Sequence, residues 1–186
     1  VDGVLANYSV VEELPPGEIG EIIVCGDVVT RAYDNNEAET QLAKIRDGET
    51  LWHRMGDTGY LDAEGRLWFC GRKAHRVVTR LGTLFTIPCE AIVNEHPDVY
   101  RSALVGVPSA GDPAIKEAVL IVEPHRTSRP EAELLAEVRE LAGRHPLTRD
   151  IRHFLIHRDF PVDIRHNAKI FREKLAVWAA TRVKTA

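Results

Sequence analysis

Hydrophobic residues recur in short runs and at alternate positions over the first seventy residues, a pattern typical of β-strands. A β-branched run at 22–24 lies among turn glycines, and residues 59–61 are predicted to pair with 66–70 as a hairpin. The loop at 62–65 reads DAEG, which suits a type I turn that ends in a left-handed glycine. A turn and a short polar helix are expected within 33–50. This part of the chain is therefore predicted to be rich in β-structure.

After residue 72 the pattern mixes strands with amphipathic helices. Strands are predicted at 99–108, 116–124 and 152–161, and helices at 88–97, 128–143 and 168–183. The helix at 128–143 has the clearest signals, because Ser128 and Glu131 have capping-box spacing and Gly143 follows its apolar stripe. We predict an α+β fold with two parts: a β-rich part at 1–72 and a small α+β domain at 73–186.

Composition and charge narrow the function classes. The 186 residues are 44% hydrophobic, which permits a packed core, and the formal charge of −4 disfavours a nucleic-acid or anionic-membrane binder. The three cysteines, Cys25, Cys70 and Cys89, are too far apart for a CxxC pair, and their odd number suits a reducing compartment. No apolar run has the length of a membrane span, and no signal peptide is recognisable. We expect a cytoplasmic protein.

Three polar residues are candidates for chemistry, and each has an ordinary structural explanation. Asp57 follows a glycine and is a turn residue or, alternatively, a carboxylate that accepts hydrogen bonds from the hydroxyls of a ribose. Arg72 is a surface cation or a nucleotide contact. Lys169 is predicted to lie in the first turn of the last helix, where a positive charge is mildly unfavourable.

Two other groups of polar residues are better explained by structural roles than by ligand binding. His153 and His157 lie in a predicted strand, in which four residues span about 13 Å, too far for one metal ion. The basic residues around Lys169 alternate with acids and have one aromatic neighbour, Phe171, which is typical of a solvated helix face. We therefore predict no metal site and no RNA contact.

Three stretches of the chain carry a family resemblance. GEIGEIIVCGDVVTRAY at 17–33 matches the pattern G-E-L-x-x-x-G-x-x-V-x-x-G-Y, and RMGDTGYLDAEGRLWFCGR at 54–72 matches T-G-D-x-x-x-x-D-x-x-G-x-x-x-x-x-G-R with Met55 for Thr. PVDIRHNAKIFREKL at 161–175 matches P-x-T-x-x-G-K-x-x-R-x-x-L, with Ala168 for Gly and two extra residues. In this order the motifs resemble the C-terminal third of the adenylate-forming enzymes, the superfamily of acyl-CoA synthetases, luciferases and adenylation domains.

This resemblance implies roles for the three candidates. Lys169 would be the catalytic lysine that lies between the α-phosphate of ATP and the substrate carboxylate, where a fixed ammonium stabilises the meeting of two anions. Asp57 would hold the ribose diol, and Arg72 would contact the nucleotide. The resemblance also implies that 1–72 ends a larger N-terminal domain, that 73–186 is a mobile lid, and that the cofactors are ATP and Mg²⁺.

Three sequence stretches indicate one subgroup of the superfamily. WFCGRKAHRVVT, PCEAI and RHNAKIFREKLAVWA are most similar to the β-lactone synthetases of bacterial long-chain olefin biosynthesis. The resemblance implies a ligase that adenylates a 2-alkyl-3-hydroxy fatty acid, whose own hydroxyl then closes the lactone. Ala74 replaces the usual hinge Asp or Lys, and Gly82-Thr83-Leu84 replaces a G-x-R that helps line the coenzyme A tunnel in thioester-forming members. Other enzymes of the olefin pathway are expected partners.

Parts of the family pattern have no counterpart in this sequence. The chain begins with Val1 and its only methionine is Met55, so we expect a piece of a longer protein. The family's Ser/Thr/Gly-rich phosphate loop is not found, and the Mg²⁺ ligand is expected in the N-terminal part, so the chain alone is expected to be inactive. A fatty acyl-CoA or acyl-AMP ligase is the alternative enzyme, and a non-catalytic docking module of a multienzyme assembly is the alternative of another class.

Overall fold

The computed structural model describes residues 2–109, 111–112, 114–125, 130–163 and 165–183, with only the backbone described at 166–168. The chain divides into two compact units, Val1–Ala74 and His75–Ala186. The division falls two residues after the predicted boundary of 72. A short 3₁₀ helix, η2 (Lys73–His75), spans it. Both units mix strands and helices, so the α+β prediction is confirmed.

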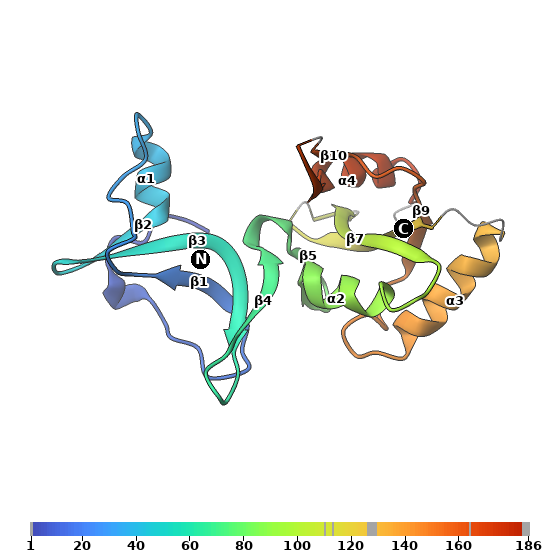
Figure 1. Ribbon diagram of the computed structural model, residues 1–186, viewed down its shortest axis with the longest axis horizontal. Coiled ribbons are helices and arrows are strands. Elements are labelled where there is room, and N and C mark those ends of the chain that lie inside the picture. Colours follow the sequence, from blue (N-terminus) through green and yellow to red (C-terminus); the bar gives the residue numbers. More distant parts are fainter. Residues whose placement is uncertain (1, 110, 113, 126–129, 164, 184–186) are drawn as a thin grey trace. The chain divides into compact units, whose positions relative to one another are not determined.

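The first unit is built around one long strand. Its elements are the 3₁₀ helix η1 (Tyr8–Val10), β1 (Gly20–Val24), α1 (Glu37–Ala43), β2 (Lys44–Asp47), β3 (Thr50–Leu61) and β4 (Leu67–Arg72). β3 pairs antiparallel with β1, β2 and β4, as the four-stranded sheet in Figure 1 shows. β1 contains the predicted β-branched run, and α1 is the predicted polar helix. β2 was not predicted.

The hairpin between β3 and β4 follows the sequence closely. Leu61 pairs with Leu67 and Gly59 with Phe69, within the two segments that were predicted to pair. Asp62 closes the loop, because its Oδ1 accepts hydrogen bonds from the backbone N–H groups of Glu64 and Arg66. Gly65 has a positive φ, as predicted, with a value of 76°. These local interactions explain why this hairpin could be predicted from the sequence alone.

The second unit has a three-stranded sheet between helices. Its elements are β5 (Val77–Thr79), β6 (Gly82–Leu84), α2 (Thr86–Val93), β7 (Val99–Pro108), β8 (Lys116–Pro124), α3 (Glu131–Gly143), β9 (His153–Ile156), β10 (Val162–Asp163), β11 (His166–Ile170) and α4 (Arg172–Ala180). The sheet order is β7-β8-β9, antiparallel and then parallel, so β7 is an outer strand. β5 pairs with β6, and β10 pairs with β11, in two small hairpins.

Alternation along β7 and β8 divides the core of this unit into two clusters. Leu104, Leu120 and Val122 pack on one face with residues of α2 and α3. Ala103, Val105, Val107, Val119 and Ile121 pack on the other face with Leu175 and Ala179 of α4. Figure 1 shows α4 on one side of the sheet and α2 and α3 on the other. The period-two pattern of the two strands therefore produces three layers.

The structure corrects several predicted boundaries. The strand predicted at 152–161 is limited to β9, His153–Ile156. The last helix begins at Arg172 and not at 168, because Val162 pairs with Ile170 and the N–H of Phe171 donates to the carbonyl of Pro161 at 2.8 Å. α2 ends at Val93, before Pro97. The predicted cap Ser128 lies outside the described residues, and the position that precedes α3 is Pro130, which supplies no side-chain cap.

The cysteines differ in their expected reactivity. Cys25 is exposed, whereas Cys70 and Cys89 are buried. Burial raises the pKa of the Cys70 thiol. Burial together with the charge of Glu90 raises the pKa of Cys89 to about 12. Because the thiolate is the reactive form, we expect iodoacetamide at pH 8 to alkylate Cys25 in the native protein and the other two only after unfolding. Peptide mass spectrometry would measure this, and rapid native alkylation of Cys89 would contradict it.

Candidate active site

Two of the three candidate residues lie opposite each other in the first unit. Asp57 of β3 and Arg72 of β4 are paired across the ladder, and each follows a left-handed glycine, Gly56 with φ 67° and Gly71 with φ 115°. An L side chain rarely adopts such a φ. Thr58, which is buried, ties the two strands further because its hydroxyl donates to the carbonyl of Gly71 at 2.8 Å. The register of the hairpin thus brings the two side chains together.

The Asp57 carboxylate has an acceptor that remains unused. Its Oδ1 lies 3.1 Å from Nη1 of Arg72, and the same Nη1 donates a 3.1 Å hydrogen bond to the carbonyl of Met55. The contact to Asp57 is an ion pair without hydrogen-bond geometry, and among the described residues this buried Oδ1 accepts no hydrogen bond. A buried acceptor without a donor is unfavourable. The ionic contact with Arg72 offsets part of this penalty.

The pair therefore suits recognition of a polyhydroxylated, anionic ligand. The Asp57 side chain is 19% exposed and that of Arg72 is 59% exposed, so the carboxylate is held in place while the guanidinium faces solvent. A carboxylate accepts from neighbouring hydroxyls, and a guanidinium donates to phosphate or ribose oxygens. A ribose phosphate offers both kinds of partner.

Ion pairs hold the segment after Arg72 to the first unit. Lys73 Nζ lies 2.7 Å from Oε2 of Glu21, and the same oxygen accepts from Arg54 at 2.7 Å. Arg54 also donates to the carbonyls of Gly3 and Leu42. Burial of Glu21 opposes its ionisation, but the two cations outweigh it and lower the pKa of the carboxyl. Lys73 is therefore fixed one residue before Ala74, at which the first unit ends.

The third candidate lies in the second unit and in a different element from the one predicted. Lys169 is in β11, exposed, and separated from α4 by Ile170 and Phe171. The predicted place of Lys169 in the first turn of the last helix is therefore wrong, because hairpin pairing with β10 overrides the helical periodicity of 168–183. A lysine on a short, paired strand presents its ammonium from a defined backbone position.

Asp163, next to this strand, was not identified from the sequence. It is buried and accepts hydrogen bonds from the backbone and the guanidinium of Arg165. These bonds lower the pKa of Asp163, and the charge of Lys169 lowers it further. The D-x-R spacing is a weak signal for such a turn. Asp163 therefore remains an anion close to Lys169.

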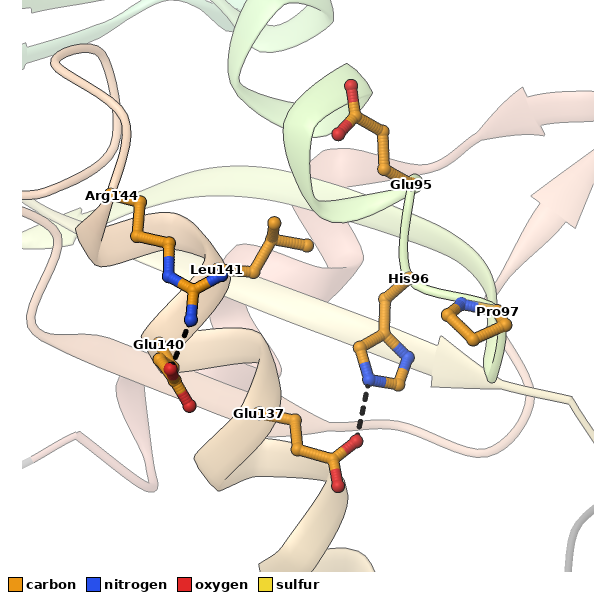
Figure 2. Close-up of a pocket in the computed structure, with 7 residues that line it drawn as sticks. All are labelled: Glu95, His96, Pro97, Glu137, Glu140, Leu141 and Arg144. Carbon is orange, nitrogen blue, oxygen red and sulfur yellow. Dashed lines mark hydrogen bonds and ion pairs between the residues drawn. The ribbon is translucent and has the colours of Figure 1, made fainter.

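One hollow in the second unit is lined by none of these residues. It lies between the segment that follows α2 and the helix α3, as Figure 2 shows. Its volume is about 320 Å³. His96 Nε2 lies 2.9 Å from Oε2 of Glu137, and His96 Nδ1 accepts from the N–H of Asp98. Both ring nitrogens of His96 therefore have partners within the protein. The arrangement supports packing of α2 against α3 and presents no open ligand position.

Within the described ranges no cluster of three His, Cys, Asp or Glu side chains could hold a metal ion. The part of the chain that the structure describes has no helix long and apolar enough to cross a membrane.

Comparison with solved structures defines the class to which the fold corresponds. The amide bond synthetase McbA from Marinactinospora thermotolerans superposes with a TM-score of 0.75 at 24% identity, over 94% of this chain and 34% of that one. ATP-bound MatB from Rhodopseudomonas palustris gives a TM-score of 0.76 at 23% identity, over 97% and 34%. At these identities the likeness shows the fold alone, and the chain corresponds to about a third of each solved chain.

Comparison with curated sequences is more specific. The chain is 51% identical to an olefin β-lactone synthetase of Xanthomonas campestris pv. campestris and 47% identical to one of Stenotrophomonas maltophilia, over 96% and 98% of its own length. It spans about a third of the length of these relatives. No family model matches the chain. The resemblance to adenylate-forming enzymes, and among them to olefin β-lactone synthetase, is confirmed.

Proposed function

We propose that this chain is the C-terminal part of an ATP-dependent, AMP-forming ligase that converts a 2-alkyl-3-hydroxy fatty acid to a β-lactone. The observation that carries the proposal is the 51% identity to an olefin β-lactone synthetase over nearly the whole chain. The paired Asp57 and Arg72, which hold a carboxylate and a guanidinium opposite each other, support a nucleotide site in the first unit. The chain alone is expected to form no adenylate.

The reaction has two steps, and residues of this chain serve the first. A carboxylate oxygen of the acid attacks the α-phosphorus of ATP, the bond to pyrophosphate breaks, and an acyl-adenylate forms. Asp57 accepts hydrogen bonds from the ribose hydroxyls and Arg72 donates to the nucleotide. The ammonium of Lys169 stabilises the charge that builds up as the two anions meet. In the second step the 3-hydroxyl attacks the acyl carbon and releases its proton to solvent, the bond to AMP breaks with its electrons on the phosphate oxygen, and the lactone closes.

The two units suggest where the molecule moves between these steps. In the proposal His75–Ala186 acts as the lid and Val1–Ala74 ends the larger domain. The ion pairs of Lys73 with Glu21 and of Glu21 with Arg54 hold the chain on the first unit up to the boundary. Rotation would therefore involve backbone dihedrals after Lys73, around Ala74 and His75.

The test is pyrophosphate release by the full-length protein with ATP, Mg²⁺ and a 2-alkyl-3-hydroxy fatty acid, with and without CoA. Lactone and AMP are expected in equal amounts without CoA, because the nucleophile is part of the substrate. The same acid without its 3-hydroxyl is the control, and we expect it to stop at the adenylate.

A CoA-dependent ligase is the second candidate, since the chain is also 35% identical over 127 residues to a 4-chlorobenzoate–CoA ligase of an Arthrobacter species. Product that forms only when CoA is present would support it and overturn the lactone proposal. Absence of pyrophosphate release under either condition would overturn both ligase proposals.

A further inference from the structure

A buried ion pair links the start of α4 to α2. Glu90 of α2 is 5% exposed, and its two carboxylate oxygens each contact a different nitrogen of the Arg172 guanidinium. Nη2 of Arg172 donates to Oε2 at 2.9 Å, and Nη1 contacts Oε1. This two-fold contact fixes the plane of the guanidinium as well as its position. The two residues are 82 positions apart in the sequence.

The same pair supplies hydrogen-bond partners to the backbone of the outer strand of the sheet. β7 is an outer strand, and the backbone groups of Leu104 that point away from β8 need partners. The N–H of Leu104 donates to Oε1 of Glu90 at 2.7 Å, and its carbonyl accepts from Nη1 of Arg172 at 3.4 Å. Glu90 comes from the α2 side of the sheet and Arg172 from the α4 side. The pair therefore anchors α4 to both the strand and α2.

This anchor lies very close to Lys169 along the chain. Arg172 is the first residue of α4, and only Ile170 and Phe171 separate it from Lys169. Ile170 packs against the core cluster that contains Leu175, and Phe171 is bonded through its N–H to Pro161. These contacts leave little freedom between the guanidinium and β11. Lys169 itself is exposed, so its placement depends on its backbone.

We infer that Glu90 and Arg172 are positioning residues for Lys169, which hold β11 in register so that the exposed ammonium meets the reacting phosphate. The inference rests on the proposed function, because it requires that Lys169 take part in adenylation. Burial raises the pKa of Glu90, while Arg172 and the N–H of Leu104 oppose that rise. The Arg172 guanidinium and the Leu104 N–H therefore stabilise the charged form of a carboxylate whose burial disfavours it.

The experiment uses full-length Arg172→Met and measures backbone exchange and kinetics. Amide hydrogen exchange at residues 166–171 is expected to become about 10-fold faster or more, because the anchor is lost. The kcat for adenylation is expected to fall on the order of 10²-fold, with the KM for ATP changed less than about 2-fold, since misplacement of about 1 Å suffices for such a loss. Arg172→Lys, which keeps the charge and one bond, should recover part of kcat.

Val138→Ala is the matched control for general loss of stability. Val138 is buried in the core cluster on the opposite face of the sheet from α4. We expect this variant to melt at a lower temperature but to retain wild-type exchange at 166–171 and wild-type kcat.

Unchanged exchange at 166–171 in Arg172→Met would overturn the inference, as would equal losses of kcat in Arg172→Met and Val138→Ala. If the wild-type protein forms no adenylate, the proposed function fails, and the claim that the pair positions Lys169 for adenylation falls with it. The exchange measurement would still report whether the pair anchors β11, so the two failures can be told apart.

Discussion

Lys169→Ala in the full-length protein is expected to lower the rate of adenylate formation by about 10²–10³-fold, the range found when one group that stabilises a developing charge is removed. Affinity for ATP should change by less than about 3-fold, because in the proposed mechanism the ammonium acts mainly in the transition state. Single-turnover pyrophosphate release measures the first quantity and equilibrium binding of ATP the second.

The matched control for Lys169→Ala removes a positive charge elsewhere in the same unit. Arg144 of the α3 C-cap pairs with Glu140 on the surface, and its side chain is 72% exposed. Arg144→Ala should leave both rate and affinity unchanged, since exposed pairs contribute little. Adenylation at the wild-type rate in Lys169→Ala would contradict the catalytic role and favour a non-catalytic docking module.

Asp57→Ala should weaken ATP binding on the order of 10²-fold, because two charge-assisted hydrogen bonds to the ribose are lost. The variant also frees Arg72 from its ion pair, so the guanidinium is less well placed for the nucleotide. Asp57→Asn should have a smaller effect, since the amide retains one acceptor oxygen. Isothermal titration of each full-length variant with ATP measures the affinity.

Glu64→Gln is the corresponding control for Asp57→Ala. Glu64 lies in the loop of the same hairpin, with a side chain that is 65% exposed and paired to Arg66. Its neutralisation removes the same charge from the same hairpin and should leave ATP affinity unchanged. Near-wild-type affinity in Asp57→Ala would contradict the assignment of the ribose contact to this carboxylate.

The elements that were predicted correctly are those that local interactions determine. The hairpin through 62–65 and the stripe of α3 were predicted, because turn residues and helical spacing act over a few positions. The start of the last helix was predicted wrongly, because pairing of Ile170 with Val162 decides it and the helical periodicity does not. Short edge elements such as β2 and β10 have too few residues for a periodic signal.

The sequence by itself determined the α+β class, most of the larger strands and helices, the three candidate residues and the family resemblance, since these depend on local pattern and on motif spacing. Tertiary structure alone showed that Asp57 faces Arg72 with an unused acceptor, and that Lys169 stands on a strand. It alone showed that Glu90 holds Arg172 across 82 positions. These facts depend on strand register and on the packing of distant elements, which no local pattern encodes.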